Sequence, residues 1–302
     1  MKENVKVVLV QADTKSMYEK EHNIQDHVNK ILSLKEEKPD LVVFPELSIS
    51  GYIRESNPAN RQDYWEYGAE HVPGPATNRI IEAAREVGCY VIFGIAERTE
   101  VPMVSYNSAV LVGPEGLVGI TRKIHLPLIE KDYFAQGTEP KVFDTNIGQI
   151  GIIICYELFF PEPSRMMAIL GAEICVFIGF VAVRSAEETA QGKGGGVGIG
   201  DEKQYLFNVA PRIRALENQM CFVACTAGDK HDMGGETGKW QRAGRSKIID
   251  NFGRIIAESP HDSEDIVIGN LSGADLRLGR AAYPMLKDRR PWMYDSFLKK
   301  SL

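Results

Sequence analysis

Short apolar runs alternate with helical patterns along most of this chain, and the alternation limits the possible folds more than any other feature. In the clearest case, GQIGIIICYELFFPEP at Gly148 to Pro163, an apolar run stops abruptly at Cys155. Runs of this kind are typical of buried strands, whereas apolar residues recurring every three or four positions indicate amphipathic helices. Strands bracketed by helices and interrupted by hairpins predict a mixed sheet covered by helices, which is an α/β layered fold.

The expected elements follow from these two periodicities. Strands are expected at Val5–Val10, Leu41–Phe44, Tyr90–Ile95, Gln149–Ile154, Glu173–Ile178, Cys221–Cys225 and Asp265–Leu271. Helices are expected at Ser16–Lys35, Thr77–Val87, Glu162–Leu170 and Tyr205–Glu217. Hairpins are expected to join Ser108–Val112 to Leu117–Thr121 and Ser246–Asp250 to Arg254–Glu258.

Two long stretches, Leu47–Pro73 and Val181–Lys203, carry little regular pattern. The second includes the glycine-rich run at 191–200, which lacks the GxxxxGK[ST] arrangement of a phosphate-binding loop. We expect a surface loop there, and loops of this length often cover a site.

Composition excludes several classes of function. The 302 residues carry a net charge of -6, so the basic excess typical of nucleic-acid or lipid binding is missing. The five cysteines form no CxxC pair, which favours a reducing, cytoplasmic location over a disulfide framework. We expect no signal peptide and no membrane span. No group of His, Cys, Asp or Glu shows the spacing of metal ligands, so we expect neither a metal nor a cofactor.

Three apolar runs end in reactive side chains: Glu46, Lys123 and Cys155. Because sites in open α/β sheets collect at the carboxyl ends of strands, these three could meet. A carboxylate, an ammonium and a thiol would then supply a general base, an electrostatic clamp and a nucleophile. Taken singly, Glu46 could cap a turn, Lys123 could be solvated and Cys155 could be a core residue. His125 is the nearest histidine to this group.

The segments around these residues resemble the signatures of the carbon–nitrogen hydrolase, or nitrilase, superfamily. They are PELSISGY (Pro45–Tyr52), RKIHLP (Arg122–Pro127) and GIIICYELFFPE (Gly151–Glu162), supported by VVLVQAD near the start, RALEN (Arg214–Asn218) and GRSKIIDNFGRIIAE (Gly244–Glu258). The resemblance covers about Val5 to Leu271. It implies a four-layer α-β-β-α sandwich with two mixed β-sheets, extended across a dimer interface. It also implies a single domain over residues 1–280 and a C-terminal tail at 281–302.

The resemblance further implies a role for each matched residue. Cys155 matches the nucleophile that forms a thioester acyl-enzyme, and Glu46 matches the general base. Lys123 matches the cation that stabilises the tetrahedral oxyanion, helped by the backbone N–H of Tyr156. Glu130 matches a second glutamate that positions Lys123 and the substrate, although a solvated loop charge is the alternative.

The implied reaction is hydrolysis of an amide or N-carbamoyl amine, with release of ammonia or an amine. Tyr156-Glu157 lies between the patterns that follow the cysteine in nitrilases and in amidases. A nitrilase acting on a nitrile and a catalytically silent binding member are therefore the alternatives. A thiol redox protein is disfavoured because no resolving cysteine adjoins Cys155.

Residues beside the matched positions are candidates for contact with a small-molecule substrate. They are Tyr52, Phe134, Tyr156, Phe180 and Arg184, with a solvated loop arginine as the alternative for Arg184. The tail is richer in aromatic residues than a free tail needs. We therefore expect it to pack on a neighbouring subunit of a homodimer or higher homo-oligomer.

Overall fold

The structure is a computed structural model that describes residues 1–53, 57–184, 199–228, 230–232 and 239–298. Its body is built on two six-stranded sheets. The first sheet has the order β15 (Asp265–Ser272), β1 (Asn4–Gln11), β2 (Leu41–Val43), β3 (Tyr90–Arg98), β4 (Ser105–Gly113), β5 (Gly116–Arg122). The second has the order β14 (Ile255–Glu258), β13 (Lys247–Ile249), β10 (Cys221–Thr226), β8 (Ile174–Gly179), β7 (Gly148–Ile154), β6 (Val142–Thr145).

Both sheets are mixed. In the first, β1, β2 and β3 are parallel, while β15, β4 and β5 are antiparallel to their neighbours. In the second, β7, β8 and β10 are parallel, and the outer strands β6, β13 and β14 are antiparallel to theirs. A small third sheet joins β11 (Lys230–Asp232), β12 (Lys239–Arg242) and β9 (Ala182–Arg184).

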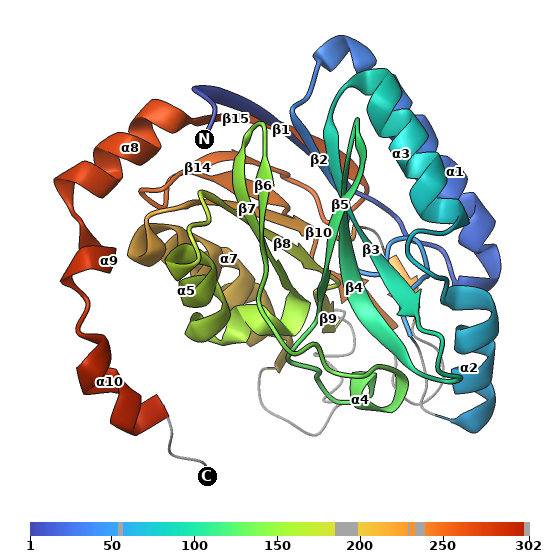
Figure 1. The fold of residues 1–302 in the computed structure, drawn as a ribbon. Coiled ribbons are helices and arrows are strands. Elements are labelled where there is room, and N and C mark those ends of the chain that lie inside the picture. The colour runs from blue at the N-terminus through green and yellow to red at the C-terminus, as the bar shows by residue number, and fades with distance from the viewer. Residues whose placement is uncertain (54–56, 185–198, 229, 233–238, 299–302) are drawn as a thin grey trace.

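Helices cover the outer faces of the two large sheets (Figure 1). The first sheet is covered by α1 (Lys20–Ser33) and α3 (Pro75–Val87), and the second by α5 (Pro161–Ile169) and α7 (Ile199–Asn218). Shorter helices are α2 (Pro58–Asp63), followed by the π-helical turn Tyr64–Gly68, and α4 (Glu130–Tyr133). The predicted α-β-β-α sandwich is confirmed, and its extension across a dimer interface stays a prediction.

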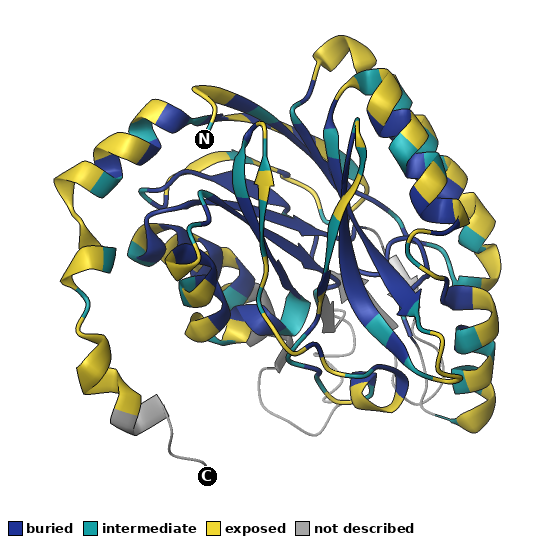
Figure 2. Cartoon of the chain, viewed as in Figure 1, coloured by how far each residue is buried: buried dark blue, intermediate teal, exposed yellow. Residues whose placement is uncertain are grey.

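The continuous apolar runs are explained by burial on both faces of the strands, seen as dark blue in Figure 2. On β1, Val7 and Leu9 face the second sheet, while Val8 and Val10 pack under the helices. Burying one such side chain contributes about 1.5–3 kcal/mol. The two large sheets therefore enclose one apolar layer, and each sheet shares another with its helices.

The structure contains short elements that the sequence pattern does not predict. They are β6, β9, β11, β12, α2, α4 and the turn Tyr64–Gly68, of which β9, α2 and that turn lie in the two stretches expected to be irregular. These elements are too short to show a periodicity. α2 does carry a start signal, because the Asn57 side chain accepts a hydrogen bond from the Asn60 N–H and Pro58 follows it. Residues 191–198 of the glycine-rich run lie outside the described residues.

The end of the chain forms an arm along one side of the body (red in Figure 1). It consists of α8 (Gly273–Ala282), α9 (Met285–Asp288) and α10 (Pro291–Leu298). Its surface is mostly exposed (Figure 2), and Tyr283 and Trp292 are 72% and 71% exposed. In the described parts of the chain, no helix combines the length and apolarity needed to cross a bilayer.

Candidate active site

The three predicted strand ends converge. Glu46 follows β2 by three residues, Lys123 directly follows β5, and Cys155 directly follows β7. β2 and β5 belong to the first sheet and β7 to the second. The charges of Glu46 and Lys123 both shift the pKa of the Cys155 thiol, so the three groups lie together where the two sheets face each other.

A glycine on β3 makes room for the chain that carries Glu46. The Gly94 N–H donates to the Pro45 carbonyl, and the Ile49 N–H donates to the Gly94 carbonyl, both at 3.1 Å. A Cβ at position 94 would lie 2.2 Å from the Leu47 nitrogen and 2.7 Å from the Glu46 backbone. Only glycine allows this approach.

Lys123 is paired with two carboxylates in the interior. Its Nζ lies 2.6 Å from Glu46 Oε1 and 2.8 Å from the Glu130 carboxylate. The side chains of all three residues are fully buried. Because a desolvated charge is costly unless it is paired, the two carboxylates and the ammonium depend on one another. Glu130, predicted from a short motif, thus lies beside Lys123.

The electrostatics of the cluster keep Lys123 charged. Burial lowers the pKa of Lys123, but the charges of Glu46 and Glu130 more than offset this, and the pKa is raised overall. Burial, reinforced by Glu46, raises the pKa of Glu130 despite the opposing charge of Lys123. The cluster therefore carries a permanent cation next to a carboxyl group that holds a proton more readily than usual.

Cys155 is the first residue of the 3₁₀ turn Cys155–Phe159, which directly follows β7. Its φ of 48° lies in the left-handed region, which a non-glycine residue adopts at a cost of about 1–3 kcal/mol. Burial raises the pKa of the thiol, Glu46 raises it further, and Lys123 opposes both. The resting thiol is therefore protonated near neutral pH, and a base must take its proton before it can attack.

Tyr52 and Phe180, both predicted substrate contacts, meet at this site. Their rings stack with centroids 4.2 Å apart. The Tyr52 hydroxyl donates to Glu130 Oε1 at 2.9 Å, and the Phe180 N–H donates to Glu46 Oε2 at 2.9 Å. Burial raises the pKa of Tyr52 well above its usual range, so its hydroxyl remains a donor. The pair thus contacts both carboxylates.

The other predicted contacts lie in different surroundings. Phe134 is buried and packs edge-on against Tyr64, with centroids 5.9 Å apart. Tyr156 packs with Phe159 and Phe160. Arg184 ends β9, and its side chain lies outside the described residues. The structure therefore places Phe134 and Tyr156 in aromatic clusters, and their contact with a substrate stays a prediction.

Asn107 of β4 is a site residue that the sequence reasoning missed. Its Nδ2 donates to Glu46 Oε1 at 2.8 Å and to Glu130 Oε2 at 3.2 Å, and its backbone carbonyl accepts from the Lys123 backbone N–H at 2.8 Å. The side chain is fully buried. The amide nitrogen must face the carboxylates, because the reversed orientation would set an oxygen against two oxygens. A single asparagine inside a strand gives no sequence signal for this bridge.

The Asn107→Asp variant is expected to lose about 2–4 kcal/mol of stability at pH 8, because a third carboxylate would face Glu46 and Glu130. Burial and these neighbours would raise the folded-state pKa of the new carboxyl above its unfolded value of about 3.9. The loss should therefore be largest above the folded-state pKa and shrink as the pH falls toward 5.

Urea denaturation at pH 5 and pH 8 measures this loss. Asn270→Asp on the exposed face of β15 is the matched control and should change little. Because Asn and Asp have nearly the same shape, equal stability of Asn107→Asp and the wild type at both pH values would contradict the bridging role.

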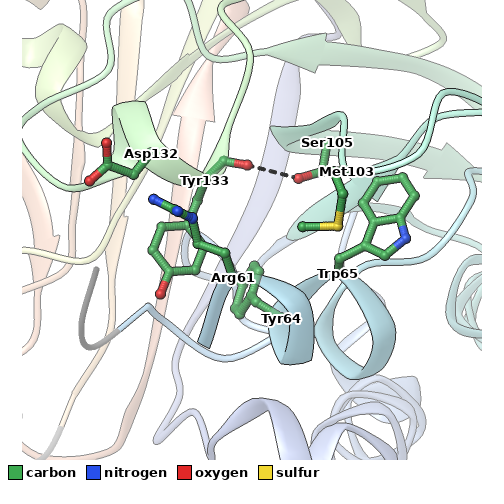
Figure 3. A pocket seen from close by; sticks show the side chains of 7 residues that line it. All are labelled: Arg61, Tyr64, Trp65, Met103, Ser105, Asp132 and Tyr133. Carbon is green, nitrogen blue, oxygen red and sulfur yellow. Dashed lines mark hydrogen bonds between the residues drawn. The ribbon is translucent and has the colours of Figure 1, made fainter. Parts of the chain in front are cut away.

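A pocket of about 140 Å³ lies beside α4, the helix that begins at Glu130. Figure 3 shows the side chains that line it: Arg61, Tyr64, Trp65, Met103, Ser105, Asp132 and Tyr133. The Ser105 hydroxyl donates to the Tyr133 carbonyl at 3.1 Å (Figure 3). None of Glu46, Lys123, Glu130 and Cys155 lines this pocket, so it adjoins the site through α4.

Comparisons with known proteins agree on one family. Residues 6–281 match the family described as carbon-nitrogen hydrolase. A nitrilase of Pyrococcus abyssi is 30% identical over 299 residues, which cover 96% of this chain and 99% of that protein. An (R)-stereoselective amidase of a Pseudomonas species is 31% identical, covering 83% of this chain and 80% of the amidase. The crystal structure of a carbon-nitrogen hydrolase from Helicobacter pylori G27 shares the fold, with a TM-score of 0.83 at 22% identity over 99% of each chain. The resemblance seen in the motifs is confirmed, and the chain belongs to the carbon–nitrogen hydrolase family.

Proposed function

We propose that this protein hydrolyses the C–N bond of an amide or an N-carbamoyl amine through a thioester on Cys155. The observation that supports this most is the position of the Cys155 thiol beside a buried carboxylate–ammonium–carboxylate cluster. An amide carbon is a poor electrophile, so attack on it needs both a base and a site for negative charge. Glu46 and Lys123 provide these two functions.

In the first half of the proposed reaction, the Cys155 proton passes to Glu46 as Sγ bonds to the carbonyl carbon. The carbonyl oxygen becomes an oxyanion, which Lys123 Nζ and the Tyr156 N–H stabilise. The C–N bond then breaks, the leaving nitrogen takes the proton from Glu46, and ammonia or an amine departs. In the second half, Glu46 removes a proton from water as the water oxygen bonds to the thioester carbon. The C–S bond then breaks, Sγ takes the proton from Glu46, and the carboxylic or carbamic acid departs.

Glu130 is proposed to position Lys123 and the substrate. It contacts Nζ directly, and the Tyr52 hydroxyl holds its Oε1. Tyr52 and Phe180 then offer the substrate an apolar wall next to polar groups, which suits a small amide. Phe134, Tyr156 and Arg184 are kept as further candidates for substrate contact.

A substrate panel tests the proposal. Primary amides, N-carbamoyl amines and nitriles are each incubated with the protein, ammonia release is measured, and acylated Cys155 is sought by intact-mass spectrometry. We expect ammonia and a Cys155 adduct with amides or N-carbamoyl amines. Turnover of nitriles alone would favour the nitrilase alternative. No turnover and no adduct with any class would favour a silent binding member.

We also propose that the segment at 281–302 packs on a neighbouring subunit of a homo-oligomer. Tyr283 and Trp292 are more than two-thirds exposed on the arm, which is more aromatic surface than a solvated tail needs. Deleting the residues after Ala281 is expected to reduce the mass measured by light scattering. A monodisperse monomer that the deletion leaves unchanged would contradict this packing.

A reducing, cytoplasmic location is proposed as well. All five cysteines are unpaired, and four of them are buried. Fractionation of cells that express the protein would test this, and recovery outside the cytoplasm would overturn it.

A further inference from the structure

We propose that Glu157 is a positioning residue that holds Lys123 and Cys155 at a fixed separation; this inference rests on the proposed function. In the sequence, Tyr156-Glu157 lies between the patterns of nitrilases and amidases, and the proposed reaction gives Glu157 no role.

The contacts of Glu157 join the two segments that carry the cation and the thiol. Its Oε2 accepts from the Ile154 N–H at 2.8 Å, and its Oε1 accepts from the Ile124 N–H at 2.9 Å. Ile154 directly precedes Cys155, and Ile124 directly follows Lys123. The Glu157 side chain is only 3% exposed. One desolvated carboxylate thus links residues adjacent to both reacting groups.

The link needs a carboxylate of this length. Two backbone N–H groups each require an acceptor, and a glutamate offers one oxygen to each. In glutamine, one of the two positions would be an NH₂ group facing an N–H, which leaves a buried donor unpaired. Aspartate keeps the charge but is one methylene shorter. We therefore expect it to accept a good hydrogen bond from one of the two N–H groups and a poor one from the other.

Open space borders the link on its outer side. A cavity of about 150 Å³ borders Glu157, Ile124 and His125. The His125 ring stacks on Phe160 at 4.5 Å, and its Nδ1 lies 3.6 Å from Glu157 Oε1, beyond hydrogen-bond length but within ion-pair distance when His125 is protonated. Glu157 raises the pKa of His125. Because open space adjoins this side, the segment after Lys123 can shift when the Glu157 contacts are lost.

A shift of Lys123 would change a measurable property of the thiol. The charge of Lys123 lowers the pKa of Cys155, against the effects of burial and Glu46. If Glu157 fixes Lys123 beside the thiol, weakening its contacts must raise the pH at which Cys155 becomes reactive. Loss of packing alone would lower the melting temperature without moving that pH.

The test measures the rate of Cys155 alkylation by iodoacetamide between pH 6 and 10, using intact mass, and takes as the midpoint the pH at which half of Cys155 is alkylated in a fixed time. The other four cysteines are buried, and the reaction needs no turnover, so its failure is distinct from failure of the proposed hydrolysis. For Glu157→Gln we expect the midpoint to rise by about one pH unit and the rate at pH 7 to fall about tenfold. With any amide that the wild type hydrolyses, kcat should fall much more than KM rises.

Two further variants complete the test. Glu157→Asp should give an intermediate midpoint, and it supplies the result if Glu157→Gln does not fold. Glu162→Gln is the matched control, because this exposed glutamate borders the same cavity and should leave the midpoint unchanged. A lowered melting temperature with wild-type midpoints in the folded Glu157 variants would overturn the proposal.

Discussion

The Cys155→Ala variant is expected to lose ammonia release by at least about 10⁴-fold while keeping its fold, because the substitution removes the only protein atom proposed to bond to the substrate carbon. Alanine fits the same turn, and the side chain is only partly buried, so stability should change by no more than about 1 kcal/mol. Ammonia release measures activity, and circular dichroism with thermal melting checks the fold.

A second cysteine provides the control for this variant. Cys89 is buried beside the helices of the first sheet. Cys89→Ala should lower the melting temperature by a few degrees and leave turnover intact. If Cys155→Ala retained wild-type turnover on the same substrate, the thioester mechanism would be wrong.

Lys123→Met is expected to abolish turnover and also to destabilise the protein by about 3–5 kcal/mol. Removal of one partner from a buried ion pair leaves an uncompensated charge, and here it leaves two carboxylates. The pKa of Glu130 is already raised in the presence of Lys123, and loss of the ammonium would raise it further. A carboxyl group with a raised folded-state pKa favours the folded state at low pH and loses that contribution as the pH rises through the pKa.

The stability gap between Lys123→Met and the wild type should therefore be smaller at pH 5 than at pH 8. Urea denaturation at the two pH values measures it. Lys247 is the matched control, because it is another buried lysine paired with a glutamate, Nζ lying 2.7 Å from Glu258 Oε1. Lys247→Met should cost stability and spare turnover. Equal gaps at both pH values would contradict the charge argument for Lys123.

The sequence was sufficient to predict the layered architecture, because strands buried on both faces must be apolar throughout. The sequence also predicted that Glu46, Lys123 and Cys155 each follow a strand, because each comes after an apolar run. Edge strands such as β6 and three-residue strands such as β9 were missed because neither is long enough or apolar enough to show a period.

The supporting residues of the site could not be predicted in the same way. Asn107 lies within β4, and its importance comes from two carboxylates that are 61 and 23 positions away in the chain. Gly94 is needed only because the backbone of Glu46 crosses it. The need for asparagine at one position and glycine at the other depends on which segments the tertiary fold brings together. A local sequence pattern therefore does not indicate it.

The division of the proposed reacting groups between the two sheets has a consequence for heat inactivation. Glu46 and Lys123 move with the first sheet and Cys155 with the second, so their separation depends on the apolar layer between the sheets. Each sheet can keep its hydrogen bonds while that layer loosens slightly on warming. Catalysis is far more sensitive than secondary structure to a displacement of about 1 Å. Turnover should accordingly decline at temperatures where the far-ultraviolet spectrum is still native.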